Sequence, residues 1–205
     1  MAPLPIGATS STAACPLVLD PNGDDVDWVV GGFGAGISEE TLDLRSADIG
    51  ANRDWFTVVI RVQRLTLPAA TSPAGVMYTF ALSTGEETLE FLAAAEVGSP
   101  ARYQLRSLTT TGTNDAYLVA PTPLPVPVVG SMDPRTNEIR MSVRRREIER
   151  VTKLREGGLV RVRQLYSWRS VPLGPDSFVA SADEATGDLT YRVGRPGCIT
   201  AGPKN

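Results

Sequence analysis

The chemistry open to this chain is limited first by a missing residue type, because none of its 205 residues is histidine. His is the usual general base near neutral pH, the usual activator of a serine or cysteine nucleophile and the commonest metal ligand. Ser-His-Asp and Cys-His catalysis, catalytic zinc and His-ligated haem are therefore excluded. Carboxylate chemistry of the glycosidase type and a Ser-Lys arrangement remain, and Lys153 and Lys204 are the only lysines for the latter. We therefore expect a protein that is not an enzyme.

Two cysteines, Cys15 and Cys198, stand near the two ends of the chain. Domain termini often lie close together, so a bond between them would tie both ends of one closed domain. In the chain-entropy model such a long loop stabilises the fold by about 5 kcal/mol as an upper figure. The alternative is a pair of buried free thiols, as in most intracellular proteins. We predict the disulfide, and with it an oxidising, extracellular compartment.

Four carboxylates crowd one turn near the N-terminus, and calcium takes six to eight oxygen ligands of this kind. They are Asp20, Asp24, Asp25 and Asp27. If the disulfide forms, Asp183 and Glu184 can approach this turn, because they lie in the segment leading to Cys198. We expect a structural calcium ion held by Asp20, Asp24 and Asp183. The alternative is a solvated acidic turn.

Three tryptophans, Trp28, Trp55 and Trp168, could stack on the apolar CH faces of sugar rings, although core packing is the commoner place for Trp in a sandwich. Trp55 begins a strand whose inward face starts at Phe56, so Trp55 points away from the core. Trp168 lies in YSWRS beside an arginine. We therefore select Trp55 and Trp168 as candidate ligand-binding residues.

Basic residues are dense between positions 140 and 155 and would suit a phosphate or a polyanionic glycan. They are Arg140, Arg144, Arg145, Arg146, Arg150, Lys153 and Arg155. Glu147, Glu149 and Glu156 are interleaved and largely cancel the charge. A solvated face with weak ion pairs is the preferred interpretation.

Alternation of apolar and polar residues predicts half-buried strands at 55–65, 76–83 and 137–144. The side chains expected to face the core are Phe56, Val58, Ile60, Val62, Tyr78, Phe80, Leu82, Ile139, Met141 and Val143. Those expected in water are Thr57, Arg61, Gln63, Arg140, Ser142 and Arg144. Weaker strands are predicted at 26–31, 41–49, 88–94, 101–108, 116–119, 126–132, 159–170, 177–181 and 189–193.

Gly- and Pro-containing turns separate these segments, and the one helical candidate, 145–156, is expected to cross between two sheets. Prolines make 121–127 an edge or a connection. Many short strands in a chain of this length predict an all-β fold, an antiparallel jelly-roll-like β-sandwich of a single domain. We expect an N-terminal arm or linker over 1–16, the sandwich over 17–199 and a C-terminal tail over 200–205.

The composition restricts the cellular compartment and the binding partners that we expect for this chain. A net charge of −3 and a pI near 5.1 give no general attraction to nucleic acid or anionic membranes. No apolar run approaches the ~20 residues of a membrane helix. Residues 1–14 lack the basic and apolar regions of an intact signal peptide. Either Met1 replaces a removed signal peptide, or export uses another route.

A series of short motifs resembles the extracellular β-sandwich superfamily that includes family 9 carbohydrate-binding modules and DOMON domains. The motifs are DPNGD at 20–24, LDLRSADI at 42–49, the strand beginning at Trp55, YTFAL at 78–82, MDPRTNEIRMSV at 132–143 and SADEATGDLTYRVG at 181–194. The resemblance covers residues 17–199. It implies a jelly-roll-like sandwich, frequent structural calcium and a ligand site of aromatic side chains. Relatives that bind sugar clamp it between two Trp rings, whereas haem binding is not expected of a chain without His.

We therefore expect a secreted, non-catalytic recognition or accessory module for carbohydrate or cell-surface material. The alternative is a structural protein, a subunit of an extracellular assembly such as a surface layer, a filament or a virus particle, whose partners would be copies of itself. A hydrolase with two carboxylates is a third, more distant hypothesis. The sequence names no particular ligand.

Overall fold

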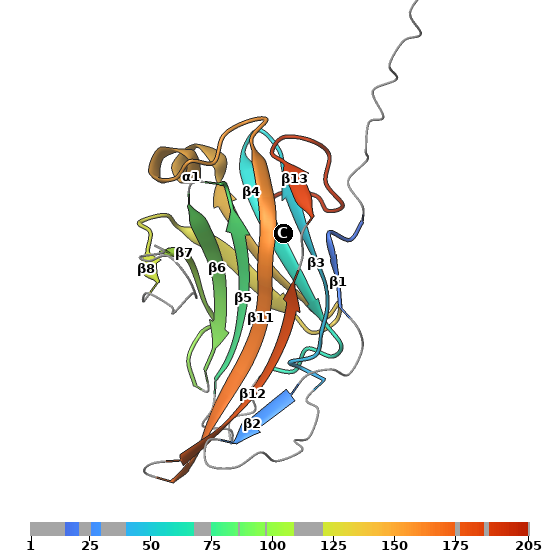
Figure 1. Cartoon of the computed structure of the whole chain (residues 1–205), viewed down its shortest axis with the longest axis vertical. Helices are drawn as coiled ribbons and strands as arrows, with labels where there is room; N and C mark the ends of the chain where they lie inside the picture. Colours follow the sequence, from blue (N-terminus) through green and yellow to red (C-terminus); the bar gives the residue numbers. More distant parts are fainter. Residues whose placement is uncertain are drawn as a thin grey trace, which may run out of the picture.

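The chain folds into two antiparallel sheets packed face to face, as the computed structural model shows (Figure 1). The structure describes residues 15–20, 26–29, 40–67, 75–85, 87–96, 98–108, 121–174, 177–186 and 189–204. This arrangement confirms the predicted all-β class, a β-sandwich of one domain with one short helix.

The first sheet has five strands in the order β1-β3-β4-β10-β9. Their bounds are β1 (Val18–Leu19), β3 (Leu44–Ala51), β4 (Trp55–Val62), β10 (Glu138–Arg144) and β9 (Val128–Asp133). The centre of this sheet is β4, which pairs with β3 on one side and with β10 on the other.

The second sheet has eight strands, seven of which follow the order β2-β12-β11-β5-β6-β7-β8 while β13 pairs with β11. Their bounds are β2 (Val26–Val29), β5 (Val76–Ser83), β6 (Thr88–Ala95), β7 (Arg102–Leu108), β8 (Thr122–Pro123), β11 (Leu159–Gly174), β12 (Ser177–Thr186) and β13 (Thr190–Arg192). The short β8 lies at an edge, as its prolines predicted.

The helix α1 (Arg145–Val151) leads from β10 of one sheet to β11 of the other, which confirms the predicted crossing. It ends earlier than predicted, because the chain becomes extended at Thr152. There the Thr152 hydroxyl donates to the Ile148 carbonyl at 2.8 Å. One predicted feature, the strand at 116–119, lies outside the described residues.

The core lies between the sheets and contains the side chains that the alternation predicted. Phe56 of the five-stranded sheet stacks on Phe91 of the eight-stranded sheet, with ring centroids 5.9 Å apart. All ten residues expected to face inward are buried. Burying them removes a large apolar area from water and is the main favourable term in this fold.

Side chains from the eight-stranded sheet also bind the backbone that leads into β3. The hydroxyls of Tyr78 and Ser167 donate to the carbonyls of Thr41 and Leu42, at 2.8 and 2.5 Å. These bonds satisfy backbone groups that would otherwise be buried between the sheets without partners.

The outward face of the five-stranded sheet corrects a prediction. Thr57 and Ser142 were expected in water, but both are 0% exposed, and Arg140 is only 7% exposed. The reason is that the C-terminal segment, residues 197–204, packs on this face: the Gly202 N–H donates to Thr57 Oγ1 at 2.8 Å. Arg144 is exposed, as predicted.

One open side of the sandwich is closed where β7 approaches β9. The Tyr103 ring packs over Gly130, and a Cβ at Gly130 would lie 2.1 Å from Tyr103 Cδ1. A larger residue at this position must displace the ring.

We predict that Gly130→Ala lowers the free energy of unfolding by about 1–3 kcal/mol, the usual cost of overpacking. Urea denaturation monitored by circular dichroism measures it. The matched control is Ser131→Ala, one residue along the strand, which should change stability by less than about 0.5 kcal/mol. Equal effects of the two substitutions would contradict the packing described here.

Candidate functional site

Two aromatic side chains stand next to each other on the outward face of the eight-stranded sheet, at Tyr166 and Trp168 of β11. Alternation places them outward, since Leu165 and Ser167 between and beside them are buried in the sandwich. Both aromatic side chains are partly exposed. Residues two apart on a strand are about 7 Å apart, so the two rings form one continuous surface.

Strand register identifies the neighbours of this pair, which we call the β11 aromatic face. Thr79 and Met77 of β5 are directly opposite Tyr166 and Trp168. The next rank on β6 is Leu92 and Ala94. Gln104 of β7 lies opposite Leu92 and is the last residue in this cross-strand row. Thr79, Leu92 and Ala94 are buried, so the accessible part of this face consists of the Tyr166 and Trp168 side chains with Met77 and Gln104.

Charged groups border the β11 aromatic face without dominating it. Arg106 Nη1 lies 3.5 Å from Glu90 Oε2 and largely neutralises it. Burial raises the pKa of Glu90, and the charge and hydrogen bond of Arg106 offset part of that rise. On the other side, burial and then the charge of Glu184 raise the pKa of Tyr166, which keeps its hydroxyl protonated at neutral pH.

Trp55, the second predicted stacking residue, lies in the other sheet. Its ring is covered by the Arg144 guanidinium, 4.0 Å from the ring centroid, and it contacts Gly202 of the C-terminal segment. The structure therefore does not bring Trp55 and Trp168 to one site. Trp28 lies in β2 at the edge of the eight-stranded sheet.

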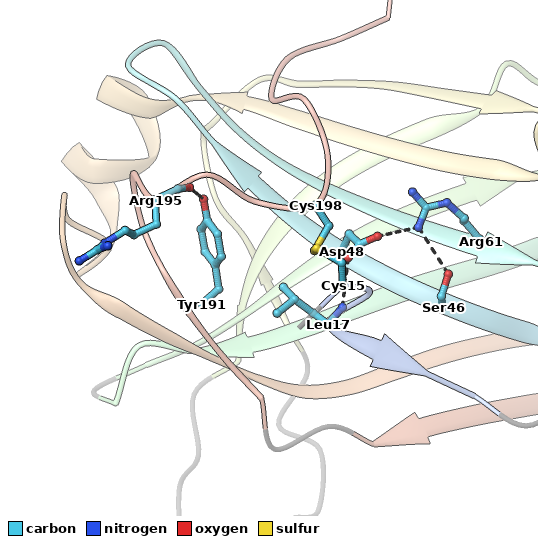
Figure 2. The surroundings of a disulfide bond; sticks show 8 residues. All are labelled: Cys15, Leu17, Ser46, Asp48, Arg61, Tyr191, Arg195 and Cys198. Atoms are coloured by element: carbon cyan, nitrogen blue, oxygen red, sulfur yellow. Dashed lines mark hydrogen bonds and ion pairs between the residues drawn. A yellow bond between two sulfur atoms is a disulfide. The ribbon is translucent and has the colours of Figure 1, made fainter. Parts of the chain in front are cut away.

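The predicted disulfide is present: Cys15 and Cys198 are bonded, with Cα atoms 5.4 Å apart (Figure 2). Asp48 of β3 positions the first cysteine, because its Oδ1 accepts from the Leu17 N–H at 3.1 Å. Tyr191 of β13 positions the second by donating to the Arg195 carbonyl at 2.6 Å. The segments that carry Cys15 and Cys198 are thus held against the sandwich by side chains of its strands.

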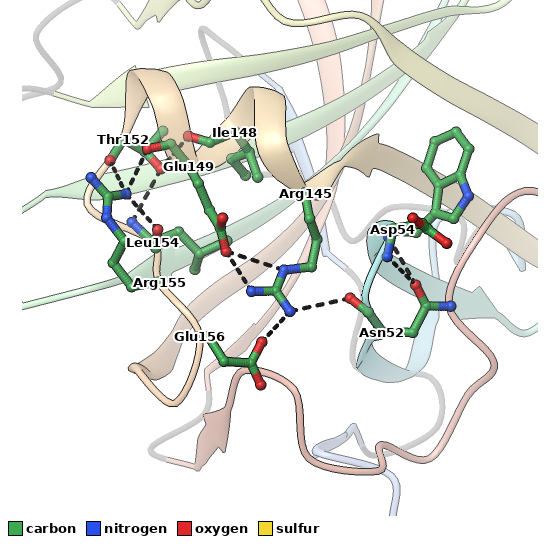
Figure 3. A network of polar contacts seen from close by, with 10 residues as sticks. Asn52, Asp54, Arg145, Ile148, Glu149, Thr152, Leu154, Arg155 and Glu156 are labelled. Carbon is green, nitrogen blue, oxygen red and sulfur yellow. Dashed lines mark hydrogen bonds and ion pairs between the residues drawn. The ribbon is translucent and has the colours of Figure 1, made fainter.

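The Arg-rich segment forms ion pairs, as preferred at the outset, but two of its residues, Arg140 and Arg145, are buried. Arg145 is 6% exposed and pairs with Glu149 and Glu156 (Figure 3). It also donates to the Asn52 carbonyl at 3.2 Å. Burial lowers the pKa of Arg145, but its hydrogen bonds to both carboxylates, and their charges, outweigh this and raise it. The two acids offset the charge of Arg145 in a pocket of about 440 Å³ that is lined also by Arg53 and Arg146.

Two of the predicted calcium ligands reach the same stretch of β3, whereas Asp24 lies outside the described residues. The Asp20 N–H donates to the Arg45 carbonyl at 3.2 Å. Asp183 is 2% exposed, and its Oδ2 accepts from the neighbouring Leu44 N–H at 2.6 Å. Asp43, which the sequence did not single out, is also buried there. Within the described part of the chain, no three potential ligands form a metal-binding group. Calcium stays a prediction.

Sequence patterns could have found Tyr166 as well as Trp168. Once Leu165 and Ser167 are assigned to the core, alternation along β11 places both aromatic residues outward. The bulge in β11 between Val162 and Gln164 obscured this, because it reverses the alternation within the segment.

Comparisons with protein-family models, with curated proteins and with solved structures found no match. Of the helices described, none is long and apolar enough to cross a membrane. The function is therefore inferred from the geometry of the chain itself.

We predict that Arg145→Met lowers the free energy of unfolding by about 1–3 kcal/mol, because it leaves Glu149 and Glu156 without their shared cation. Urea denaturation measures the change. The adjacent, exposed Arg146→Met is the matched control, with an expected change below about 0.5 kcal/mol. If both variants are as stable as the parent protein, the buried network contributes nothing measurable.

We predict that millimolar calcium raises Tm and that a chelator reverses the rise, since an ion that binds only the folded state stabilises it by mass action. Differential scanning fluorimetry measures this. In Asp183→Asn, which keeps an acceptor for the Leu44 N–H, the response to calcium should disappear. An unchanged Tm in the parent protein would identify the acidic turn as an ordinary solvated loop.

Proposed function

We propose that this protein is a secreted, non-catalytic recognition module that binds carbohydrate through the β11 aromatic face. The observation that carries the proposal is the pair Tyr166 and Trp168, partly exposed side by side near the middle of a broad sheet. Sugar rings stack on aromatic faces through their CH groups, while their hydroxyls require polar partners. Gln104 and the Tyr166 hydroxyl supply such partners.

Binding is favoured over hydrolysis by the separation of the carboxylates that border this face. Glu90 and Glu184 lie on β6 and β12, with β5 and β11 between them. Three strand spacings place them about 14 Å apart, beyond the roughly 5–9.5 Å that glycosidases use. Hydrolysis by a Ser-His-Asp or Cys-His arrangement is excluded separately, because the chain contains no His.

The disulfide supports the proposed compartment, because such bonds persist in oxidising surroundings. The resemblance to family 9 carbohydrate-binding modules supports the proposed ligand class. Calcium, if bound near Asp20 and Asp183, would have a structural role, since Asp20 lies against β3 of the other sheet and the buried Asp183 side chain of β12 is directed toward β3.

We predict that Trp168→Ala and Tyr166→Ala each weaken polysaccharide binding about tenfold or more, because a central aromatic anchor contributes about 2 kcal/mol. The probes are pull-down on cellulose, chitin and isolated cell walls, and affinity electrophoresis in xylan and mannan. Both variants should lose less stability than the about 3–5 kcal/mol of a buried aromatic truncation.

Trp55→Ala is the matched control, because it removes an indole ring from the opposite sheet. This substitution should leave binding unchanged. Binding lost in Trp55→Ala but kept in Trp168→Ala would move the ligand to the five-stranded sheet. No retention on any of these polysaccharides by the parent protein would contradict the proposed ligand class.

A further inference from the structure

The pocket beside Arg145 lies at the end of the sandwich where α1 and β13 are found (Figure 1). Its volume of about 440 Å³ falls within the roughly 300–1,000 Å³ of small-molecule sites. Three arginines against two glutamates give its lining a net charge of +1, and Asn52 and Gly194 complete the lining. The β11 aromatic face contributes no residue to it.

The buried Arg145 holds the parts of this pocket together. Its backbone N–H donates to the Asp54 carbonyl at 3.0 Å, and its Nη1 donates to the Asn52 carbonyl at 3.2 Å. These two bonds fix the first residue of α1 against the turn between β3 and β4. Because Arg145 also binds Glu149 and Glu156, four of its five side-chain N–H donors are used, and it has little capacity left for a ligand (Figure 3).

Two further walls of the pocket are fixed by the backbone. In the turn between β3 and β4, Asn52 Oδ1 accepts from the N–H groups of Asp54 and Trp55, both at 2.9 Å. On the opposite wall, Gly194 has φ +86°, and a Cβ there would lie 1.8 Å from Glu156 Oε1. Only glycine therefore allows Glu156 to lie against this wall. A pocket whose walls are formed before binding loses less free energy to ordering when a ligand enters.

Two arginines of the pocket have no carboxylate partner. Arg53 in the turn and Arg146 in α1 are both exposed, and among the residues that the structure describes neither side chain takes part in a hydrogen bond or an ion pair. Neighbouring cations are engaged elsewhere, since Arg144 covers the Trp55 ring and Arg155 donates to backbone carbonyls. Of the residues that line the pocket, Arg53 and Arg146 are thus the cations whose donors are open to a ligand.

The two glutamates of the pocket supply hydrogen-bond acceptors. Glu149 binds Arg145 through Oε1 and Glu156 binds it through Oε2, so the second oxygen of each carboxylate carries no bond to Arg145. Such an oxygen can accept from a hydroxyl group. The charges of the glutamates also restrict the anion. With a net charge of +1, the lining suits a monoanion such as a carboxylate better than the dianion of a phosphate ester.

A uronic acid combines these features, because it carries one carboxylate on a ring of hydroxyl groups. We propose that this pocket binds a uronic acid residue of an acidic polysaccharide. Arg53 and Arg146 donate to the carboxylate, which the planar guanidinium group binds through paired N–H donors, and Glu149 and Glu156 accept from the hydroxyls. This inference goes beyond the proposed carbohydrate site on the β11 aromatic face, and either site can be wrong without the other.

The test is an NMR titration of the full ¹⁵N-labelled chain with sodium galacturonate and with sodium glucuronate. Galactose and glucose, which carry a CH₂OH group in place of the carboxylate, are the matched neutral ligands, and inorganic phosphate is the dianionic one. Each uronate should shift the backbone amide signal of Gly194 and the side-chain amide signals of Asn52 in a saturable way. The neutral sugars and phosphate should bind at least about tenfold more weakly, because they lose a charge-assisted hydrogen bond or meet the charges of the glutamates.

Arg53→Gln and Arg146→Gln should each weaken uronate binding about tenfold or more, and the exposure of both side chains leaves the fold intact. Arg150→Gln is the matched control, because Arg150 is also exposed, lies one helical turn beyond Arg146 and does not line the pocket. Its uronate affinity should be unchanged. Trp168→Ala should likewise keep uronate binding, which separates this site from the β11 aromatic face.

Several outcomes would overturn the proposal. They are the absence of saturable shifts with both uronates, neutral sugars that bind as tightly as the uronates, and phosphate that binds more tightly. Equal losses in Arg146→Gln and Arg150→Gln would show a general charge effect in place of a site. A loss in Trp168→Ala as large as that in Arg146→Gln would move uronate binding to the other site.

Discussion

The buried guanidinium of Arg140 fixes the position of the C-terminal segment, residues 197–204. A charged group in this position must have acceptors, and two of them are backbone carbonyls of the C-terminal segment. Burial lowers the pKa of Arg140, Glu138 opposes that effect and Arg61 adds to it. Removing the segment would expose Arg140 along with Thr57 and Ser142. The C-terminal residues are therefore part of the folded domain, and the disulfide holds them in place.

This arrangement makes the two outward faces of the sandwich unequal. On the five-stranded sheet, polar side chains bind the chain's own terminus, and Trp55 is used by Arg144 and Gly202. On the eight-stranded sheet, Tyr166 and Trp168 keep part of their surface exposed. These two side chains retain surface that a ligand could cover, and for that reason the proposed recognition site is assigned to this second face.

Local periodicity predicted the strands well because each inward face is a run of alternate apolar residues, as in Phe56, Val58 and Ile60. It could not predict that Thr57 and Ser142 would be buried, since that depends on where the C-terminal segment, 145 residues beyond Thr57 at Gly202, comes to lie. Cys15 and Cys198 were paired correctly, because both ends of a closed domain lie near one another. Tyr166 was missed because the bulge in β11 reverses the alternation before it. Sequence patterns thus give the faces of strands, while contacts between distant segments decide which faces remain in water.

The disulfide joins two segments that are distant in the sequence and that each form few contacts of regular secondary structure. Cys15 precedes β1, an edge strand only two residues long, and Cys198 opens the C-terminal segment. Neither element contributes many ladder hydrogen bonds, so each would fray if it were free. Asp48 connects the segment after Cys15 to the sheet, since it accepts from the Leu17 N–H and from Arg61 at 2.7 Å. Arg61 also pairs with Glu138 of β10. Glu138 in turn pairs with Lys204 of the C-terminal segment. A single chain of polar contacts thus runs from one cysteine across β3, β4 and β10 to the segment that carries the other. The covalent bond and this polar chain secure the same two weak ends.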